Sequence, residues 1–208
     1  MLSIRLSIVI CLVINSCLFS QNNTRVGEEA VEFYDVGFIS ISPYYPIAIG
    51  DNFASKAQNT NLGAQLESRF VIADHILIGA RLNIFSGQVT KPELVGNYDL
   101  RNVNLIGIEA GYRIPTLKNF NMSFLAGIGA IEYRNDVDGE IFEDTGEAYS
   151  LMADADYKFS RHFSAFLTAE YRYESLNTKA PNTTVAFNKA SYIALSFGIR
   201  FYFLNERD

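Results

Sequence analysis

The stretch that decides the fold class runs from position 191 to position 203 and reads Ser-Tyr-Ile-Ala-Leu-Ser-Phe-Gly-Ile-Arg-Phe-Tyr-Phe. Large apolar side chains occupy every second position from Ile193 to Phe203, and smaller or polar residues alternate with them. A period of two is that of a β-strand with two different faces, whereas a helix repeats every 3.6 residues. The second face carries Arg200, whose charge makes a poor apolar core unless it is paired.

The same alternation recurs through most of the chain, and no segment shows a helical repeat. It covers 62–72, 76–85, 106–114, 120–133, 149–159 and 163–174. The first strand, around 32–42, is ambiguous because Ile39 and Ile41 break the alternation. We therefore expect eight strands, each close to the ~10 residues with which a tilted strand crosses a bilayer.

The connectors between these strands alternate strictly in length. The short connectors are 73–75, 115–119 and 160–162, and the long ones are 43–60, 87–100, 135–146 and 176–189. Short periplasmic turns and long extracellular loops are typical of transmembrane barrels. The predicted fold is an all-β, eight-stranded antiparallel transmembrane barrel with meander topology, and a two-layer β-sandwich with one wet face is the alternative.

The polar face of the predicted strands is charged along its whole length. Its charged members are Glu67, Arg69, Arg81, Glu109, Arg113, Asp154, Asp156, Lys158, Glu170, Arg172 and Arg200. Turned inward, these acids and bases can pair within a narrow lumen, while the aliphatic face meets lipid. We expect them to form a closed, salt-bridged lumen.

The N-terminus has the pattern of a secretory signal: Arg5, an apolar run and then a polar change after Ser20. We expect a signal peptide over 1–20, a short periplasmic lead over 21–30, the barrel over 31–204 and a periplasmic tail over 205–208. A lipid-anchored alternative remains, because the residues before Cys17 loosely resemble a lipobox. Both cysteines lie before the expected cut, so the mature chain would have no disulfide and no thiol ligand.

These features resemble the small eight-stranded outer-membrane barrels of the OmpX type and the OmpA transmembrane domain. The closing strand looks like the β-signal of barrel proteins, with Ser196, Gly198, Phe201 and Phe203 at its defining positions. The resemblance implies location in the outer membrane and recognition by the barrel-insertion machinery. The tail after Phe203 departs from the family, in which the aromatic residue is usually terminal.

Little in the sequence points to chemistry. His162-Phe163-Ser164, with Glu170 or Glu174 as a third member, resembles the His-x-Ser of lipid A deacylase barrels, but the spacing of the glutamates differs. We expect His162 and Ser164 on the inward face, and turn residues are the better interpretation of both. The acidic segment 135–147 fails as an EF-hand, leaving a solvated loop or a loose divalent-cation site. We therefore expect no catalytic residue, cofactor or metal.

The predicted function is that of a non-enzymatic, monomeric surface protein. It would support envelope integrity, or bind an unidentified extracellular partner through its outer loops, and contact outer-membrane lipid and lipopolysaccharide. A net charge of −6 argues against nucleic acid as a partner. Passive transport of small apolar molecules is the alternative function, and modification of lipid A is a weaker one.

Overall fold

The computed structural model describes residues 33–117, 119–137, 139–178 and 186–206. The expected signal peptide and periplasmic lead, with Cys17 and Ser20, lie outside the described residues. The expected tail begins inside the last strand, and its final positions, 207–208, also lie outside them.

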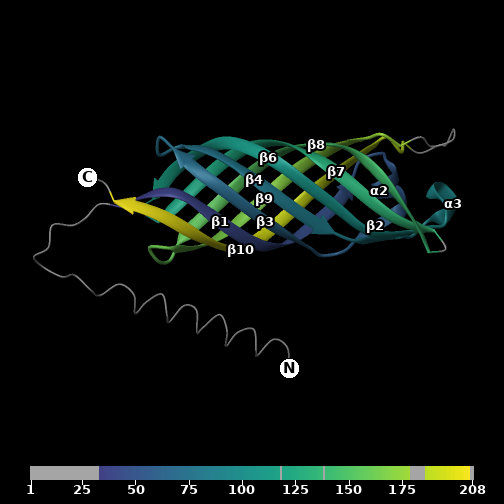
Figure 1. The fold of residues 1–208 in the computed structure, drawn as a ribbon, viewed down its shortest axis with the longest axis horizontal. Helices are drawn as coiled ribbons and strands as arrows, with labels where there is room; N and C mark the ends of the chain where they lie inside the picture. The colour runs from purple at the N-terminus through teal and green to yellow at the C-terminus, as the bar shows by residue number, and fades with distance from the viewer. Residues whose placement is uncertain (1–32, 118, 138, 179–185, 207–208) are drawn as a thin grey trace, which may run out of the picture.

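Eight antiparallel strands close into a barrel (Figure 1). They are β1 (Phe33–Ile49), β3 (Gly63–Ile72), β4 (Ile76–Phe85), β6 (Asp99–Leu117), β7 (Phe120–Val137), β8 (Glu140–Lys158), β9 (Phe163–Leu176) and β10 (Lys189–Glu206). Each strand pairs with the next barrel strand in the chain, and β1 closes the ring against β10. The predicted meander barrel is confirmed.

The two ends of the barrel differ. The chain enters β1 and leaves β10 at the end where tight turns join β3 to β4, β6 to β7 and β8 to β9, which we call the turn end. Ala73 and Asp74 form the first of these turns with positive φ angles of 49° and 64°. The opposite end, called the loop end, carries α2 and α3 (right side of Figure 1).

Two short helices at the loop end correct the expectation that the chain forms none. They are α2 (Phe53–Ala57) and α3 (Pro92–Val95), and a small two-stranded sheet, β2 (Gln58–Thr60) with β5 (Gly87–Val89), lies beside them. Helices of five and four residues are too short to display a helical repeat, and local signals form them instead. Asn52 caps α2 by accepting a hydrogen bond from the Ser55 N–H at 3.1 Å, and Pro92 opens α3. No helix within these described segments is long and apolar enough to cross a membrane.

Two expected loop boundaries were also wrong. β1 continues through Pro43, which lies opposite Ala64 of β3, and through Pro46 to Ile49. β3 accompanies β1 only as far as Tyr44, so at Pro46 β1 has one barrel neighbour, as an edge strand does, and proline is tolerated there. The acidic connector expected over 135–146 is a long hairpin instead, since β7 reaches Val137 and β8 begins at Glu140.

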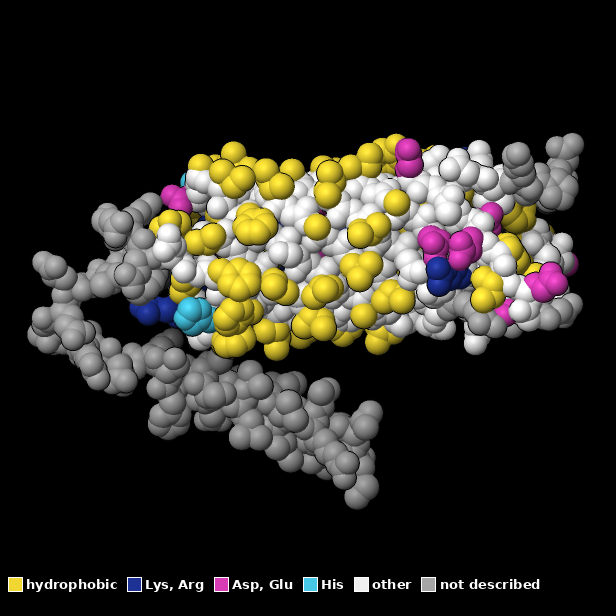
Figure 2. All heavy atoms as spheres, viewed as in Figure 1, with side chains coloured by type: hydrophobic (Ala, Val, Ile, Leu, Met, Phe, Trp, Pro, Cys, Tyr) yellow, Lys and Arg dark blue, Asp and Glu magenta, His cyan; other side chains and the backbone are white. Residues whose placement is uncertain are grey.

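The strand alternation separates two environments. Large apolar side chains cover the outside of the barrel, and charged side chains gather toward its two ends (Figure 2). Leu167 on β9 is 51% exposed, whereas its neighbour Thr168 is 3% exposed and points into the barrel. An apolar outer wall around a polar interior is the inverse of a water-soluble barrel.

Aromatic side chains form a belt on the outer wall near the turn end. Its exposed members are Phe70, Tyr112, Tyr157, Phe159, Phe163, Phe201 and Phe203. His162 stacks on Phe201 and His75 stacks on Tyr112, at centroid distances of 5.8 and 5.4 Å. Rings at this height suit the headgroup level of a bilayer.

Candidate functional site

The interior of the barrel is the candidate functional site. Arg69 on β3 is the centre of an ion-pair network in the half of the interior that is nearer the turn end. Its Nη2 donates to Glu67 at 2.9 Å and its Nη1 donates to Asp154 on β8 at 2.6 Å. Its Nε donates to Glu109 on β6. All four side chains are at most 1% exposed, so these charge-assisted bonds replace water around each group.

Arg200 on β10 extends this network toward the turn end. It pairs with Asp154 at 2.5 Å and with Asp156 at 3.4 Å. Asp156 also accepts hydrogen bonds from the hydroxyls of Tyr202, at 2.9 Å, and Ser164, at 2.5 Å. The two arginines therefore share Asp154 and link strands from all around the ring.

A second network lies nearer the loop end. Arg81 pairs with Glu170 at 2.6 Å, and Arg172 pairs with Glu174 at 2.8 Å. The hydroxyl of Tyr44 joins the two pairs, because it donates to Glu170 at 2.9 Å and accepts from Arg172 at 2.7 Å. These groups are buried as well, so removing one partner would leave a charge unpaired in a dry interior.

Aromatic rings hold the guanidinium groups from their faces. The guanidinium of Arg172 lies 4.8 Å from the ring centre of Tyr192. That of Arg200 lies 4.1 Å from Phe166 and 4.5 Å from Phe38. Such cation–π contacts strengthen when they are desolvated, as here.

Nine of the eleven charged residues expected in the lumen are buried in these two networks. The other two, Arg113 and Lys158, lie apart at the turn end. Both pair there with Asp35 on β1, at 2.6 and 2.5 Å. The structure thus divides the eleven charged residues into a buried interior group and a separate cluster at the turn-end rim.

Asp35 and Glu174 complete these ion pairs, and neither is among the lumen charges expected from the sequence, where Glu174 is considered only as a partner of His162 and Ser164. Glu174 lies on the inward face of β9 in the same alternation as Glu170 and Arg172, so its position could have indicated its role. Asp35 lies on the irregular first strand, next to a register shift between Asp35 and Gly37. In this part of β1 the sequence does not alternate, so it does not indicate which face Asp35 is on.

Among the described side chains, carboxylates outnumber guanidiniums in the buried interior. The six buried acids are Glu67, Glu109, Asp154, Asp156, Glu170 and Glu174, and the four buried bases are Arg69, Arg81, Arg172 and Arg200. Hydroxyl groups donate additional hydrogen bonds to these acids: Ser40 donates to Glu67 at 2.9 Å, and Tyr133 donates to Glu174. The buried part of the lumen therefore holds two more carboxyl groups than guanidinium groups.

The structure does not assemble the considered His-Ser pair. His162 is exposed in the β8–β9 turn, which corrects its expected inward position, and its Nδ1 lies 3.3 Å from the backbone oxygen of Tyr202. The Ser164 hydroxyl is buried and donates to Asp156. With different partners, the two side chains form no activated nucleophile in this arrangement.

The acidic hairpin is also partly paired. Arg134 lies between Glu132 and Glu143, at 2.6 and 3.1 Å, with all three side chains partly exposed. Within the described part of the chain, no group of three or more potential ligands is positioned to hold a metal ion.

The four residues predicted to form a β-signal lie on the closing strand β10. Ser196 and Gly198 face the lumen, where the Ser196 hydroxyl donates to Gln65 at 3.2 Å. Phe201 and Phe203 face outward and are 42% and 41% exposed. The two rings contact each other edge to face at 5.5 Å, within the turn-end belt.

Comparisons with known proteins agree with this architecture. The model of the family described as outer membrane protein beta-barrel domain matches residues 18–201. No curated protein matches the sequence.

Solved barrels show the same fold at low sequence identity. Neisserial surface protein A is 15% identical, with a TM-score of 0.57, over 83% of this chain and 99% of that one. The N-terminal barrel of OprF from Pseudomonas aeruginosa is 14% identical, with a TM-score of 0.51, over 82% and 100%. The outer membrane protein AlkL, solved in lipid bilayers, is 12% identical, with a TM-score of 0.52, over 87% and 96%.

The family match covers most of the chain, and the structure has the lipid-facing apolar wall that such a location requires. The turn end is then the periplasmic side, and the loop end is the extracellular side. The chain belongs to the outer membrane protein β-barrel family and resides in the outer membrane.

Proposed function

We propose that this protein is a non-enzymatic surface barrel that acts through its extracellular end. The observation that carries the proposal is the lumen, where ion pairs such as Arg69–Asp154 join opposite walls and occupy the axis. An eight-stranded barrel is only wide enough for side chains to fill. Its polar working surface is therefore the loop end.

The loop end offers a built surface for such contacts. The acidic β7–β8 hairpin projects there, and α2 packs Phe53 and Ala54 into the mouth of the barrel. Two roles fit this surface: binding of an extracellular partner, including cation-bridged lipopolysaccharide, and a structural contribution to the envelope.

The proposal includes the expected route to the membrane. The signal over 1–20 would be removed, and the β-signal at Ser196, Gly198, Phe201 and Phe203 would engage the barrel-insertion machinery. The exposed ring pair of Phe201 and Phe203 supports this assignment, because it lies on the closing strand β10 within the turn-end belt.

Passive transport of small apolar molecules is the alternative. An axial path would lead such a molecule through ten buried charged side chains, which oppose it. Catalysis on lipid A has weaker support, because His162 and Ser164 have separate partners.

Shortening the acidic hairpin tests the role of the loops. Asn135 and Phe142 are paired across the hairpin, so residues 136–141 can be replaced by an Asn-Gly turn that closes it at that pair. In a strain lacking the wild-type chain, we expect the shortened variant to restore exclusion of a large antibiotic but to lose cell aggregation and surface attachment.

The control is the amount of heat-modifiable, folded barrel, which should equal that of the wild type. Unchanged aggregation and attachment would remove the binding role and leave envelope integrity. If deletion of the whole chain changed neither the barrier nor attachment, the proposal would fail.

A further inference from the structure

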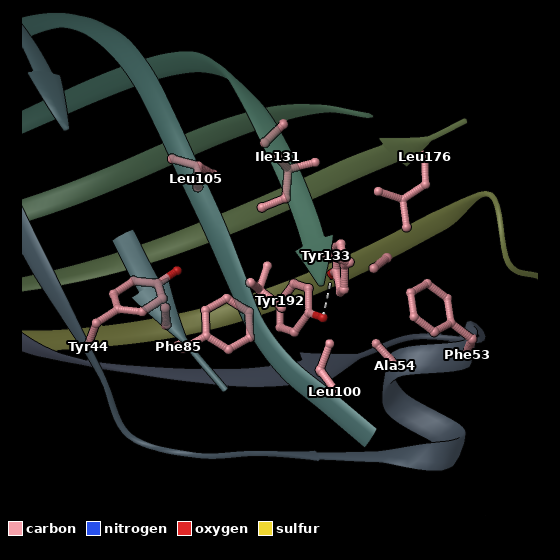
Figure 3. Packing of buried hydrophobic residues seen from close by; sticks show 14 residues of the cluster. Tyr44, Phe53, Ala54, Phe85, Leu100, Leu105, Ile131, Tyr133, Leu176 and Tyr192 are labelled. Atoms are coloured by element: carbon pink, nitrogen blue, oxygen red, sulfur yellow. Dashed lines mark hydrogen bonds between the residues drawn. The ribbon is translucent and has the colours of Figure 1, made fainter. Parts of the chain in front are cut away.

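A hollow of about 580 Å³ lies at the loop end, between α2, α3 and the extracellular ends of β7 and β8. Its size falls within the range of small-molecule sites. Phe53 on α2 forms one wall; its ring stacks on Phe187 at 5.8 Å and meets Tyr133 edge to face at 5.9 Å. Figure 3 shows Phe53 and Tyr133 close together at the mouth.

A second aromatic pair lines the hollow. Tyr98 and Phe142 meet edge to face with centroids 5.9 Å apart, and Leu94 and Val95 of α3 add aliphatic surface. This aromatic and aliphatic lining favours a compact apolar ligand, since burying apolar area is the main gain in such sites.

Gln58 contributes an unused hydrogen-bonding group to this pocket. Its side chain lines the hollow and is 6% exposed, and its Nε2 donates to the hydroxyl of Tyr98 at 3.0 Å. Its Oε1 is buried with no hydrogen-bond partner among the described residues. An unsatisfied buried acceptor is costly, so a hydrogen-bond donor that reached this oxygen from the hollow would remove that cost.

The carboxylate of Asp144, which also lines the hollow, is already engaged. Asp144 accepts from Asn135 at 3.3 Å and from Thr178 at 3.1 Å. Burial raises the pKa of Tyr98 above its ordinary value, so its hydroxyl stays neutral. With Glu93 and Asp144 both lining the hollow, an anionic ligand would meet carboxylates of its own sign.

The floor of the hollow is closed. The hydroxyl of Tyr133 hydrogen-bonds to that of Tyr192 at 2.8 Å (dashed line in Figure 3) and donates to Glu174 beneath. A molecule in this pocket therefore rests above the ion-paired lumen.

We propose that this pocket binds a small, uncharged alicyclic or aromatic alcohol, whose ring packs against the aromatic lining and whose hydroxyl donates to Oε1 of Gln58. The proposal goes beyond the loop function above, because it stands whether or not the loops bind a macromolecule.

A tryptophan reporter tests it directly. The chain has no tryptophan, so Phe142→Trp places a single indole at the pocket wall and Phe159→Trp places one at the turn end as the matched control. Each variant is placed in lipid nanodiscs and titrated with 4-tert-butylcyclohexanol. This alcohol does not absorb at the wavelengths at which indole absorbs and emits. We expect a saturable emission change for the pocket reporter alone, and equilibrium dialysis of the unmodified chain against empty nanodiscs should show the same saturable binding.

Gln58→Leu tests the hydrogen bond between the ligand hydroxyl and Gln58, and Gln88→Leu controls for the general effect of replacing a glutamine with leucine. Both glutamines lie in the small β2–β5 sheet, but Gln88 is exposed outside the pocket. Loss of one hydrogen bond should weaken binding about 2–10-fold for Gln58→Leu, with no change for Gln88→Leu. The anion 4-tert-butylcyclohexanecarboxylate should bind about 10-fold more weakly than the alcohol, or worse.

Absence of saturable binding by the folded, unmodified chain would overturn the proposed site. Equal binding by the two glutamine variants would overturn the role of Gln58. Binding of the carboxylate as tight as that of the alcohol would overturn the preference for an uncharged ligand.

Discussion

Arg69 and Asp154 form a 2.6 Å ion pair across the full width of the barrel. Arg69 lies on β3 and Asp154 on β8, and these strands are four places apart in either direction around the ring of eight. The pair therefore crosses the lumen axis, and Arg200 on β10 reaches the same carboxylate at 2.5 Å. The lumen is closed by bonds between opposite walls.

Replacing Arg69 with methionine tests how much this centre stabilises the barrel. Arg69→Met keeps much of the side-chain volume but leaves Glu67, Glu109 and Asp154 short of a positive charge in a dry interior. We expect a loss of about 3–5 kcal/mol in the free energy of unfolding, measured by urea titration in lipid vesicles.

Arg134→Met is the matched control, because Arg134 also pairs with two carboxylates but is 47% exposed on the hairpin. It should change the free energy of unfolding by no more than about 1 kcal/mol. Equal effects of the two substitutions would show that the central network adds nothing beyond a surface ion pair.

The lipid-facing wall is tested at Leu167, near the middle of β9. Leu167→Arg places a charge against hydrocarbon and should destabilise the barrel by about 2–4 kcal/mol in lipid vesicles. Leu62→Arg is the control; Leu62 is 64% exposed in the loop-end connector before β3, where water is available. Similar stabilities for the two variants would contradict the assignment of the outer wall to lipid.

The β-signal is tested by removing Phe201 and Phe203 together. The double alanine variant should lower the amount of folded barrel in the outer membrane of cells more than Phe159→Ala with Phe163→Ala. All four rings belong to the same belt, but only the first pair stands on the closing strand. Both variants should fold alike into vesicles without the insertion machinery, and equal assembly in cells would count against the signal.

The predicted cleavage is tested by the intact mass of the protein purified from outer membranes. We expect a chain that begins at Gln21, with no cysteine. A chain that begins at Cys17 and carries lipid would instead establish the lipid-anchored alternative.

The alternation of apolar and polar residues predicted which way each side chain points. It therefore predicted most of the strands and the inward position of nine buried charged residues. It did not predict the height of each residue along the barrel, because register depends on pairing between strands. Arg113 and Lys158 share a face with the central charges, yet the register places them at the rim with Asp35.

The pocket at the loop end could not be predicted from the sequence, for a related reason. Phe53 and Gln58 lie in a connector without periodicity, and only the folding of α2 into the mouth brings them near Tyr98 and Tyr133. Short segments shaped by capping and by tertiary contact leave little trace in a hydrophobic pattern.

The central claim, a lumen closed by ion pairs, is tested most directly by conductance of the purified wild-type protein in planar bilayers. With Arg69, Arg172 and Arg200 each buried among carboxylates and rings, we expect little or no steady current at any applied voltage. Large, stable, voltage-independent channels from the monomer would contradict the closed lumen and establish an open path through the barrel.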